Sequence, residues 1–464
     1  MKKYWMLLSV LCLVSLSDFC VGRPTVPAPR KDDAAWQARW ERNAALVKES
    51  NQWDVLFVGG SLVQGWETTG KDAWKRNFPY VRTLNLGYQD DTLENMIWRI
   101  LNGEAKGVSP KLIFVSVEDV NLEIAVTDAV QRVRALMWEL STHFPKARVV
   151  LTPIFPLGAA PDDPHRLYAE DVNRELAKIF SSKWLDFNDR FLAAGFLPET
   201  VRNADGTLTA AGYKLWADAI RPVIEKELPC ISPVSGYDFP VWANRYSFKR
   251  GETEAGPCDI VLIGDSVTHS WETTGKEVAK KYFAGYKIVN LGYWGQRAEH
   301  ALWHMVHNNP INQCKPKLAF VMIGSNNINA GHSPEDAARG IKTLLDVIHE
   351  QSPETKIVMT AFTPRGDSEE KQKLQDKLNE LTKEFADGKT VVWLDFTQKL
   401  LTPEGKLTKE MSYDLLHPSE KGHEIWAQAM QPFLESITPI GEGKEQGKEQ
   451  GKEQGKEQGK EQGK

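Results

Sequence analysis

Residues 66–71 read Trp-Glu-Thr-Thr-Gly-Lys, and the same six residues return at positions 271–276. Asn-Leu-Gly-Tyr at 85–88 returns at 290–293, so both pairs of segments are 205 residues apart. At similar offsets, residues 111–115 resemble 317–321, and residues 211–216 resemble 421–426. Short-period solenoids repeat every ~20–50 residues, which is far less than this spacing. The pattern therefore indicates one domain built twice.

Each half alternates short apolar runs with amphipathic stretches. The runs at 55–58 and 260–263 are apolar throughout, which is typical of strands covered on both faces. A Ser-Pro-Glu start signal at 333–335 precedes an amphipathic helix predicted over 337–350. Strands that alternate with helices favour parallel pairing and right-handed crossovers. We expect the α/β fold class, with two tandem three-layer α/β/α domains around parallel central sheets.

The two ends of the chain read differently from its middle. Lys2 and Lys3 precede an apolar run over 4–16, which predicts a signal peptide over 1–22 and export to the periplasm or the cell exterior. Cys20 leaves lipoprotein anchoring open as an alternative, in a poor sequence context. The run is too short for a membrane span of about 20 residues, and no transmembrane segment is expected elsewhere. Residues 439–464, dominated by Gly-Lys-Glu-Gln repeats, are expected to be disordered.

Charge and cysteine content narrow the classes of partner. The 57 basic and 62 acidic residues give a net charge of −5, which argues against a nucleic-acid partner. Beyond the signal region stand Cys230, Cys258 and Cys314, and none forms a CxxC motif of the kind that binds structural zinc. Cys230 and Cys258 bracket the expected linker, 229–257, and could pair; three free buried thiols are the alternative. The linker separates domains predicted over 23–228 and 258–438, and because it holds Pro, Gly and aromatic residues we expect it to pack on a domain instead of moving freely.

The second half carries residues suited to nucleophilic catalysis. Ser266 follows Gly264 and Asp265 at the end of a predicted strand, and the carboxyl ends of parallel strands form the reactive crevice of such folds. Asp414 stands three residues before His417, so it can orient an imidazole that serves Ser266 as a base. Two further strand ends carry Asn326, whose amide can enter the crevice, and Gly295, where backbone can approach a ligand.

These motifs, in this order over 255–437, resemble the SGNH (GDSL-type) hydrolases. The closest resemblance is to the branch that holds the catalytic subunits of platelet-activating factor acetylhydrolase and secreted bacterial esterases. The resemblance implies a flavodoxin-like fold, with Ser266 as nucleophile, His417 as base and Asp414 as its orienting acid. It implies an oxyanion hole built from the Ser266 N–H, the Gly295 N–H and the Asn326 side chain. It also implies an acyl-enzyme mechanism on small acyl esters, acetyl above all, with no metal or organic cofactor.

The first half keeps the serine and loses its partners. Ser61 corresponds to Ser266, whereas Asp90 replaces Gly295, Val120 replaces Asn326 and Thr207 replaces His417. We therefore predict a degenerate, inactive domain; His165 is the one imidazole that could substitute from another loop. The domain could bind carbohydrate, pack on the second domain as an intramolecular pseudo-dimer, or serve as a scaffold.

Aromatic and histidine patterns leave several interpretations open. Trp294 beside Gly295 could stack on a sugar ring or pack its own loop, whereas Trp66 and Trp271 occur in both halves and are expected in the core. The spacing of His300, His304 and His307 could place three imidazoles on one helix face, as zinc requires, although ordinary boundary histidines are the alternative. We predict a serine esterase acting on glycan or other small-molecule esters. A non-catalytic carbohydrate-binding protein and a lipid-ester or thioester hydrolase are the alternatives.

Overall fold

The computed structural model describes residues 25–50, 52–118, 120–235 and 240–440. The predicted signal peptide and nearly all of the predicted tail lie outside these residues. The chain divides into two compact units, Met1–Glu227 and Leu228–Lys464. Among the described helices, none combines the length and apolar character that crossing a membrane requires.

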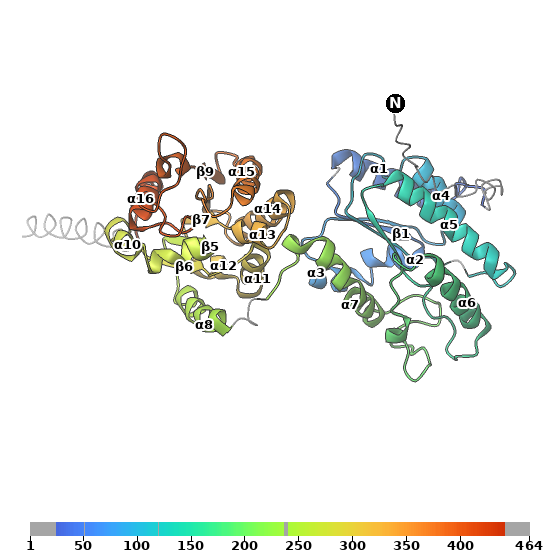
Figure 1. Cartoon of the computed structure of the whole chain (residues 1–464). Helices are drawn as coiled ribbons and strands as arrows, with labels where there is room; N and C mark the ends of the chain where they lie inside the picture. Colours follow the sequence, from blue (N-terminus) through green and yellow to red (C-terminus); the bar gives the residue numbers. More distant parts are fainter. Residues whose placement is uncertain (1–24, 51, 119, 236–239, 441–464) are drawn as a thin grey trace, which may run out of the picture. The chain divides into compact units, whose positions relative to one another are not determined.

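The first unit is a parallel sheet covered by helices (Figure 1). Its strand order is β2-β1-β3-β4, and β1 and β3 are buried along their whole length, as strands covered on both faces must be. The strands are β1 (Val55–Gly59), β2 (Thr83–Gly87), β3 (Leu112–Val115) and β4 (Arg148–Leu151). The main helices are α1 (Ala34–Glu49), α2 (Ser61–Gln64), α3 (Lys71–Asn77), α4 (Leu93–Leu101), α5 (Val126–His143), α6 (Pro164–Ile179) and α7 (Ala210–Glu227).

The second unit has a five-stranded parallel sheet in the order β6-β5-β7-β8-β9. This is the flavodoxin-like order, in which the chain reverses direction across the sheet at the first strand. The strands are β5 (Ile260–Gly264), β6 (Ile288–Gly292), β7 (Leu318–Met322), β8 (Lys356–Thr360) and β9 (Val391–Leu394). The helices are α8 (Pro240–Glu254), α9 (Ser266–His269), α10 (Lys276–Tyr282), α11 (Ala298–Asn308), α12 (Pro310–Cys314), α13 (Ser325–Asn329), α14 (Pro334–Gln351), α15 (Glu369–Lys383) and α16 (Glu420–Leu434). The α/β fold class with parallel sheets is confirmed.

Corresponding residues pair in the two sheets. Val55 lies opposite Thr83 in the first unit, and Ile260 lies opposite Ile288 in the second, each pair shifted by 205 residues. The repeated tryptophans occupy equivalent core positions: Trp66 packs 5.0 Å from Trp216, and Trp271 packs 4.9 Å from Trp426, measured between ring centroids. The core placement expected for Trp66 and Trp271 is therefore correct.

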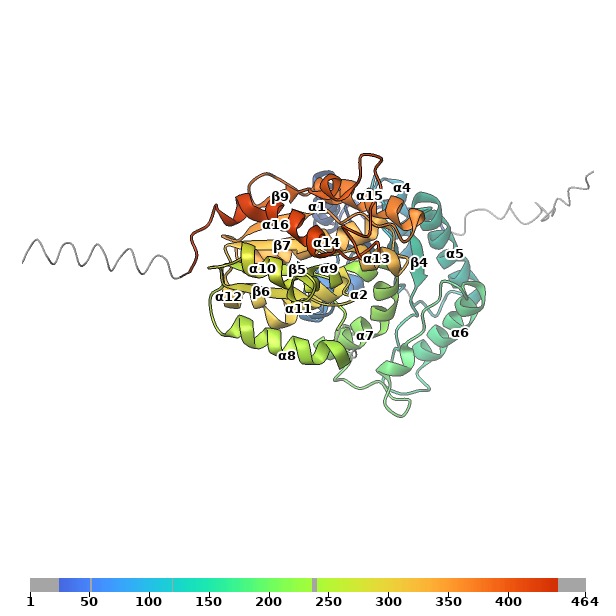
Figure 2. The same cartoon turned by 60° about the vertical axis from the view of Figure 1, so that its left-hand side comes forward.

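Much of the segment expected to be a linker is helix α8, which packs on β6 and α12 (Figure 2). Arg245 anchors it by donating from Nε to the Gly292 carbonyl at 2.8 Å. Helix α1 is anchored in the same way in the first unit, where Arg39 Nε donates to the Gly87 carbonyl at 2.6 Å. Helix α8 is thus built into the second unit as α1 is built into the first.

Candidate active site

Ser266 begins helix α9 directly after strand β5. The turn is tight: a Cβ on Gly264 would lie 2.4 Å from the Met322 carbonyl oxygen, so only glycine fits there. Asp265 caps the helix by accepting a hydrogen bond from the Val267 N–H at 3.0 Å. Strand, turn and cap together fix the serine at the carboxyl edge of the sheet.

A hydrogen-bonded chain runs from this serine to a carboxylate. Ser266 Oγ lies 2.8 Å from His417 Nε2, and His417 Nδ1 lies 2.7 Å from Asp414 Oδ2. The other oxygen of Asp414 accepts the backbone N–H groups of Leu416, at 3.0 Å, and His417, at 2.7 Å. Leu415 takes a left-handed φ of 65°, which turns the Asp-x-x-His segment back on itself. The structure thus brings together Ser266, Asp414 and His417, which lie about 150 residues apart in sequence.

Two carboxylates near the serine have opposite electrostatic environments. Burial raises the pKa of Asp265 to about 6, because the charged form loses its hydration. Partial burial also raises the pKa of Asp414, but the hydrogen bonds from the ring and backbone of His417 outweigh it and leave that pKa below its usual value. Asp414 is therefore the carboxylate that stays ionised beside His417.

Loops after β6 and β7 bring amide donors to the same edge of the sheet. Asn326, in helix α13, directs its Nδ2 toward the Gln296 carbonyl at 3.2 Å and Asp265 Oδ2 at 3.4 Å. Gly295, in the loop after β6, has a left-handed φ of 71°, and a Cβ added there would meet open space. Polar groups at the ends of β5, β6 and β7 therefore face one crevice, as the strand order requires.

Two exposed aromatic rings flank His417. The Trp294 ring is 41% exposed and lies 5.4 Å from the His417 ring. Tyr413 is 45% exposed and stacks on the same imidazole at 5.9 Å, with an interplanar angle of 13°. Sequence reasoning singled out Trp294 but missed Tyr413, although its position next to Asp414 was a signal. The exposed faces of these rings can contact a ligand that reaches the imidazole.

Helix α8 reaches the site through Trp242. Its indole N–H donates to the Trp294 carbonyl at 2.8 Å, one residue before Gly295. Together with the contact of Arg245 to Gly292, this hydrogen bond holds the end of β6 and the start of the following loop against α8. The sequence analysis missed this role because it took residues 229–257 as a connection between domains.

Behind α13, Asn327 gathers a polar cluster that contains Cys230. Its amide nitrogen lies 2.7 Å from Glu299 Oε2, 3.3 Å from Cys230 Sγ and 3.2 Å from His332 Nδ1. The ligand atoms of Cys230, Glu299 and His332 all lie within 4.8 Å of one another, so these three side chains could hold a metal ion. The Asn327 amide nitrogen already lies within hydrogen-bonding distance of all three, and its oxygen accepts the Ala298 N–H at 2.9 Å. We therefore assign the cluster to hydrogen bonding.

The pairing of Cys230 with Cys258 is not found. The three described cysteines are free thiols, and Cys230 belongs to the Asn327 cluster. Cys258 lies instead against Cys314, to whose carbonyl its backbone N–H donates at 2.8 Å. The alternative of three free buried thiols is the one the structure bears out.

The three histidines of α11 do not converge. His300 Nδ1 accepts from the Arg297 N–H at 3.2 Å, and His304 stacks on Tyr293 at 4.6 Å. His307 contacts the Trp303 carbonyl through Nδ1 at 3.1 Å. Burial lowers the pKa of His300 to about 4 and that of His304 to about 3, so both are neutral near pH 7. They are structural side chains and form no metal centre.

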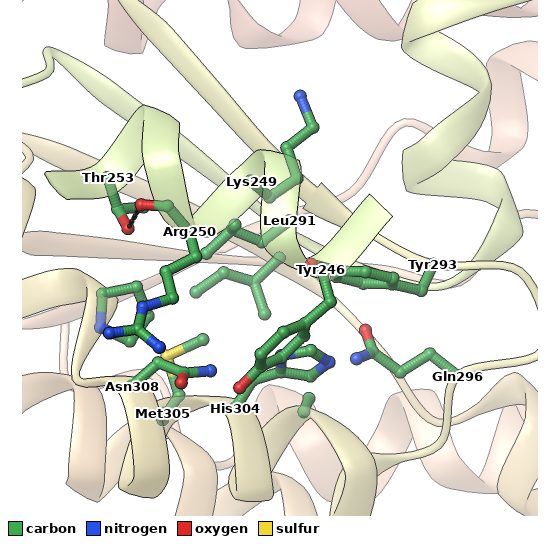
Figure 3. Close-up of a pocket in the computed structure, with 13 residues that line it drawn as sticks. Tyr246, Lys249, Arg250, Thr253, Leu291, Tyr293, Gln296, His304, Met305 and Asn308 are labelled. Carbon is green, nitrogen blue, oxygen red and sulfur yellow. Dashed lines mark hydrogen bonds between the residues drawn. The ribbon is translucent and has the colours of Figure 1, made fainter. Parts of the chain in front are cut away.

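His304 also faces a small cavity between α8, β6 and α11 (Figure 3). The cavity volume is about 20 Å³, room for about one water molecule. Tyr246, Gln296 and His304 lie around it, while Ser266, Asp414 and His417 are not among its lining residues. The cavity is thus separate from the candidate active site.

In the first unit, the equivalent crevice is rearranged. Ser61 Oγ accepts a hydrogen bond from the backbone N–H of Asp90 at 3.0 Å, and Asp90 Oδ1 lies 3.4 Å from it. Thr207 donates to Asp205, and Val120 packs against the hydrophobic core. The His165 ring lies 3.4 Å from an oxygen of Asp163, an interaction outside this crevice.

Glu118 supplies the carboxylate that Gly60 lacks. Its oxygens accept the Leu62 N–H at 2.9 and 3.0 Å, as Asp265 accepts the Val267 N–H in the second unit. A Cβ on Gly60 would lie 2.9 Å from Glu118 Oε2, so the glutamate fills the space of the missing aspartate. Burial raises the pKa of Glu118 to about 7. Position-by-position comparison of the halves could not reveal this substitution, because it moves the carboxylate to another loop.

Comparison with known proteins gives matches that cover part of the chain. Residues 262–425 match the GDSL-like Lipase/Acylhydrolase family. Platelet-activating factor acetylhydrolase IB subunit alpha1 from Homo sapiens is 26% identical over 188 residues, which are 40% of this chain and 79% of that protein. Subunit alpha2 from Rattus norvegicus is 29% identical over 164 residues, 34% of this chain and 70% of that protein. A GDSL-like lipase from Bacteroides thetaiotaomicron has 16% identity and a TM-score of 0.34, over 42% of this chain and 97% of that one.

Proposed function

We propose that the chain, whose residues 262–425 match the GDSL-like Lipase/Acylhydrolase family, is an ester hydrolase and acts as an exported acetylesterase. Its substrates would be small acyl esters, acetyl above all, on carbohydrates or similar molecules. Ser266, His417 and Asp414 would carry the chemistry in the second unit, while the first unit would be inactive.

The mechanism is a two-step acyl transfer. Ser266 Oγ attacks the ester carbonyl while His417 Nε2 takes the serine proton and then passes it to the leaving alcohol. Asp414 accepts the Nδ1–H of His417 and stabilises the imidazolium. A water molecule, activated by the same imidazole, then attacks the acyl-enzyme and releases the acid.

The negative charge on the oxygen of the tetrahedral intermediate is stabilised by hydrogen-bond donors that are already in position before the reaction. The N–H groups of Ser266 and Gly295 and the Asn326 amide would receive the oxyanion, and each such donor is worth about 3–4 kcal/mol. The hydrogen-bonded chain from Ser266 through His417 to Asp414 is the single observation that carries the proposal. All of these steps use groups of the chain itself, so we propose no metal or organic cofactor.

The acetyl and carbohydrate assignments have separate support. Relatives at 26–29% identity are named acetylhydrolases, which favours a small acyl group. Trp294 and Tyr413 offer exposed aromatic faces beside His417, and such faces can stack on a pyranose ring. A lipid-ester or thioester hydrolase would instead prefer long acyl chains, and a carbohydrate-binding protein would turn over no ester.

Hydrolysis of p-nitrophenyl acetate by wild type and Ser266→Ala tests the catalytic proposal. We expect the variant to lose at least about 10³-fold in turnover with an unchanged circular dichroism spectrum. Turnover that persists in the variant would exclude Ser266 as the nucleophile. Release of acetate from a panel of acetylated glycans, beside a series of p-nitrophenyl esters of rising chain length, tests the substrate class. A preference for long chains would overturn the acetyl assignment.

A further inference from the structure

Two buried cysteines face each other on the second unit. Cys258 lies just before strand β5, and Cys314 is the last residue of helix α12. The Cys258 N–H donates to the Cys314 carbonyl at 2.8 Å, and both residues are fully buried. A direct backbone hydrogen bond of this kind keeps two Cα atoms within the ~4.4–6.8 Å range that a disulfide spans.

The two thiol groups also interact. Their interaction raises the pKa of Cys258 and lowers that of Cys314. A thiol that more readily becomes a thiolate is the better nucleophile toward a disulfide. The pair thus has one sulfur suited to attack and a second sulfur within contact to resolve the product.

The fold itself does not call for sulfur at these positions. The equivalent residues of the first unit, 205 and 206 positions earlier, are Trp53 and Val108. Val108 is buried in the hydrophobic core, and Trp53 packs against that core. The equivalent positions of the first unit are therefore filled by apolar side chains, so the fold does not require thiols there.

We propose that Cys258 and Cys314 are a disulfide-forming modification site, oxidised by thiol–disulfide exchange with a small-molecule or protein disulfide. Because both thiols are fully buried, the exchange takes place on local opening of helix α12. The Cys314 thiolate then attacks one sulfur of the incoming disulfide, forms a mixed disulfide and releases one thiol. The Cys258 thiolate, after losing its proton to solvent, attacks the Cys314 sulfur and releases the second thiol. The protein loses two hydrogen atoms, and the oxidant is reduced to two thiols.

The bond would close a loop that contains the catalytic serine. Residues 258–314 include Ser266, Trp294 and Gly295, whereas Asn326, Asp414 and His417 lie outside. Closing a loop of this length restricts the unfolded chain, so the oxidised protein is expected to unfold at a temperature roughly 5–15 °C higher. The site is independent of the proposed catalytic roles, since neither cysteine belongs to the hydrogen-bonded chain of Ser266.

The experiment uses the full chain, reduced with dithiothreitol and then equilibrated with glutathione disulfide. Unreacted thiols are blocked with iodoacetamide in denaturant, and the digest is mapped by mass spectrometry. We expect a peptide pair linked through Cys258 and Cys314, with Cys230 alkylated. Free thiols at both positions, stable mixed disulfides with glutathione, or a link to Cys230 would overturn the proposal.

Matched variants separate the disulfide from general effects of oxidation. Cys230→Ser should keep the oxidation-dependent rise in melting temperature, whereas Cys258→Ala and Cys314→Ala should lose it. The peptide map of the wild-type protein decides the question even where an alanine variant folds poorly. A melting temperature that does not change when the wild-type protein is oxidised would contradict the expected loop closure.

Discussion

Asp265 and Glu118 cap the short helix that begins with a serine in each unit, although they come from different positions of the repeat. Each presents a carboxylate to the first N–H groups of a short helix that begins with a serine. In the first unit the residue opposite the carboxylate is Gly60, whose added Cβ would lie 2.9 Å from Glu118 Oε2, so the glycine leaves room for the glutamate. A helix N-terminus favours negative charge, yet burial raises the pKa of both groups.

The raised pKa of Asp265 predicts a pH dependence of stability. Between the unfolded value of 3.8 and the folded value of about 6, the folded protein binds more protons than the unfolded chain. Stability therefore falls as pH rises through this window, by on the order of 3 kcal/mol for this one group. Asp265→Asn keeps the acceptor for Val267 and removes the titration. We expect the unfolding free energy of the variant, relative to wild type, to rise between pH 4 and pH 7 in urea titrations; a constant difference would contradict the assignment.

Asp414 is expected to act through the orientation of His417. Asp414→Asn removes the charge that fixes the imidazole tautomer, so kcat should fall by about 10²–10⁴-fold. Because the pKa of Asp414 lies below its usual value, wild-type activity between pH 5 and pH 8 should not be limited by its protonation. The kcat for p-nitrophenyl acetate across this range checks both points. Asp395→Asn, at a similar turn where Asp395 accepts the Thr397 N–H at 2.9 Å, should leave kcat unchanged.

Site residues could be predicted from the sequence where their role depends on a local motif. Asp414 and His417 could be paired because they stand three positions apart, and Ser266 could be identified because it follows a buried strand. Glu118 could not be found in the same way, because its role depends on which loops meet in space. The contact of Cys258 with Cys314 was missed for the same reason: β5 and α12 meet only in the folded protein.

At the scale of elements, helix α8 is the main difference from expectation. Its segment contains Pro, Gly and aromatic residues, a composition typical of a connection, and its apolar side is only partly periodic. The repeat nevertheless extends to it, since Arg245 and Trp242 stand 206 residues after Arg39 and Trp36. The strands were predictable because each is an unbroken apolar run, whereas α8 is recognised by its contacts with β6 and the Trp294 loop.

These contacts predict that α8 influences catalysis from a distance. Trp242→Phe removes the donor to the Trp294 carbonyl and keeps most of the packing volume. One lost hydrogen bond of about 1 kcal/mol should loosen the loop that carries Gly295 and lower kcat for p-nitrophenyl acetate by roughly 3–10-fold.

The first unit offers a matched control for this variant. The Trp36 indole N–H donates to Asp91 at 2.6 Å, so Trp36→Phe breaks the corresponding hydrogen bond there. We expect Trp36→Phe to leave kcat unchanged while melting temperatures shift similarly in both variants. An equal loss of kcat in the two variants would show that the effect of Trp242 is one of general stability.

At the scale of the whole molecule, the two units have sheets with matching registers, but different residues surround the serine at the end of the first strand in each unit. In the second unit Ser266 faces an imidazole, and in the first unit Ser61 faces the Asp90 backbone and carboxylate. The N–H that corresponds to the Gly295 donor is thus already bonded to the serine itself. An acidic group in this place would also repel a developing oxyanion. Both features support a non-catalytic first unit.

Ser61→Ala is therefore expected to leave kcat and KM for p-nitrophenyl acetate unchanged, while Ser266→Ala abolishes turnover. The reason is local: Ser61 has no imidazole among its hydrogen-bond partners, so removal of its hydroxyl costs only the contact to Asp90. The doubly substituted protein should behave as Ser266→Ala alone. A large loss of turnover in Ser61→Ala, with an unchanged melting temperature, would show that the first unit takes part in catalysis. Residual turnover in Ser266→Ala that disappears in the double variant would locate a second active site at Ser61.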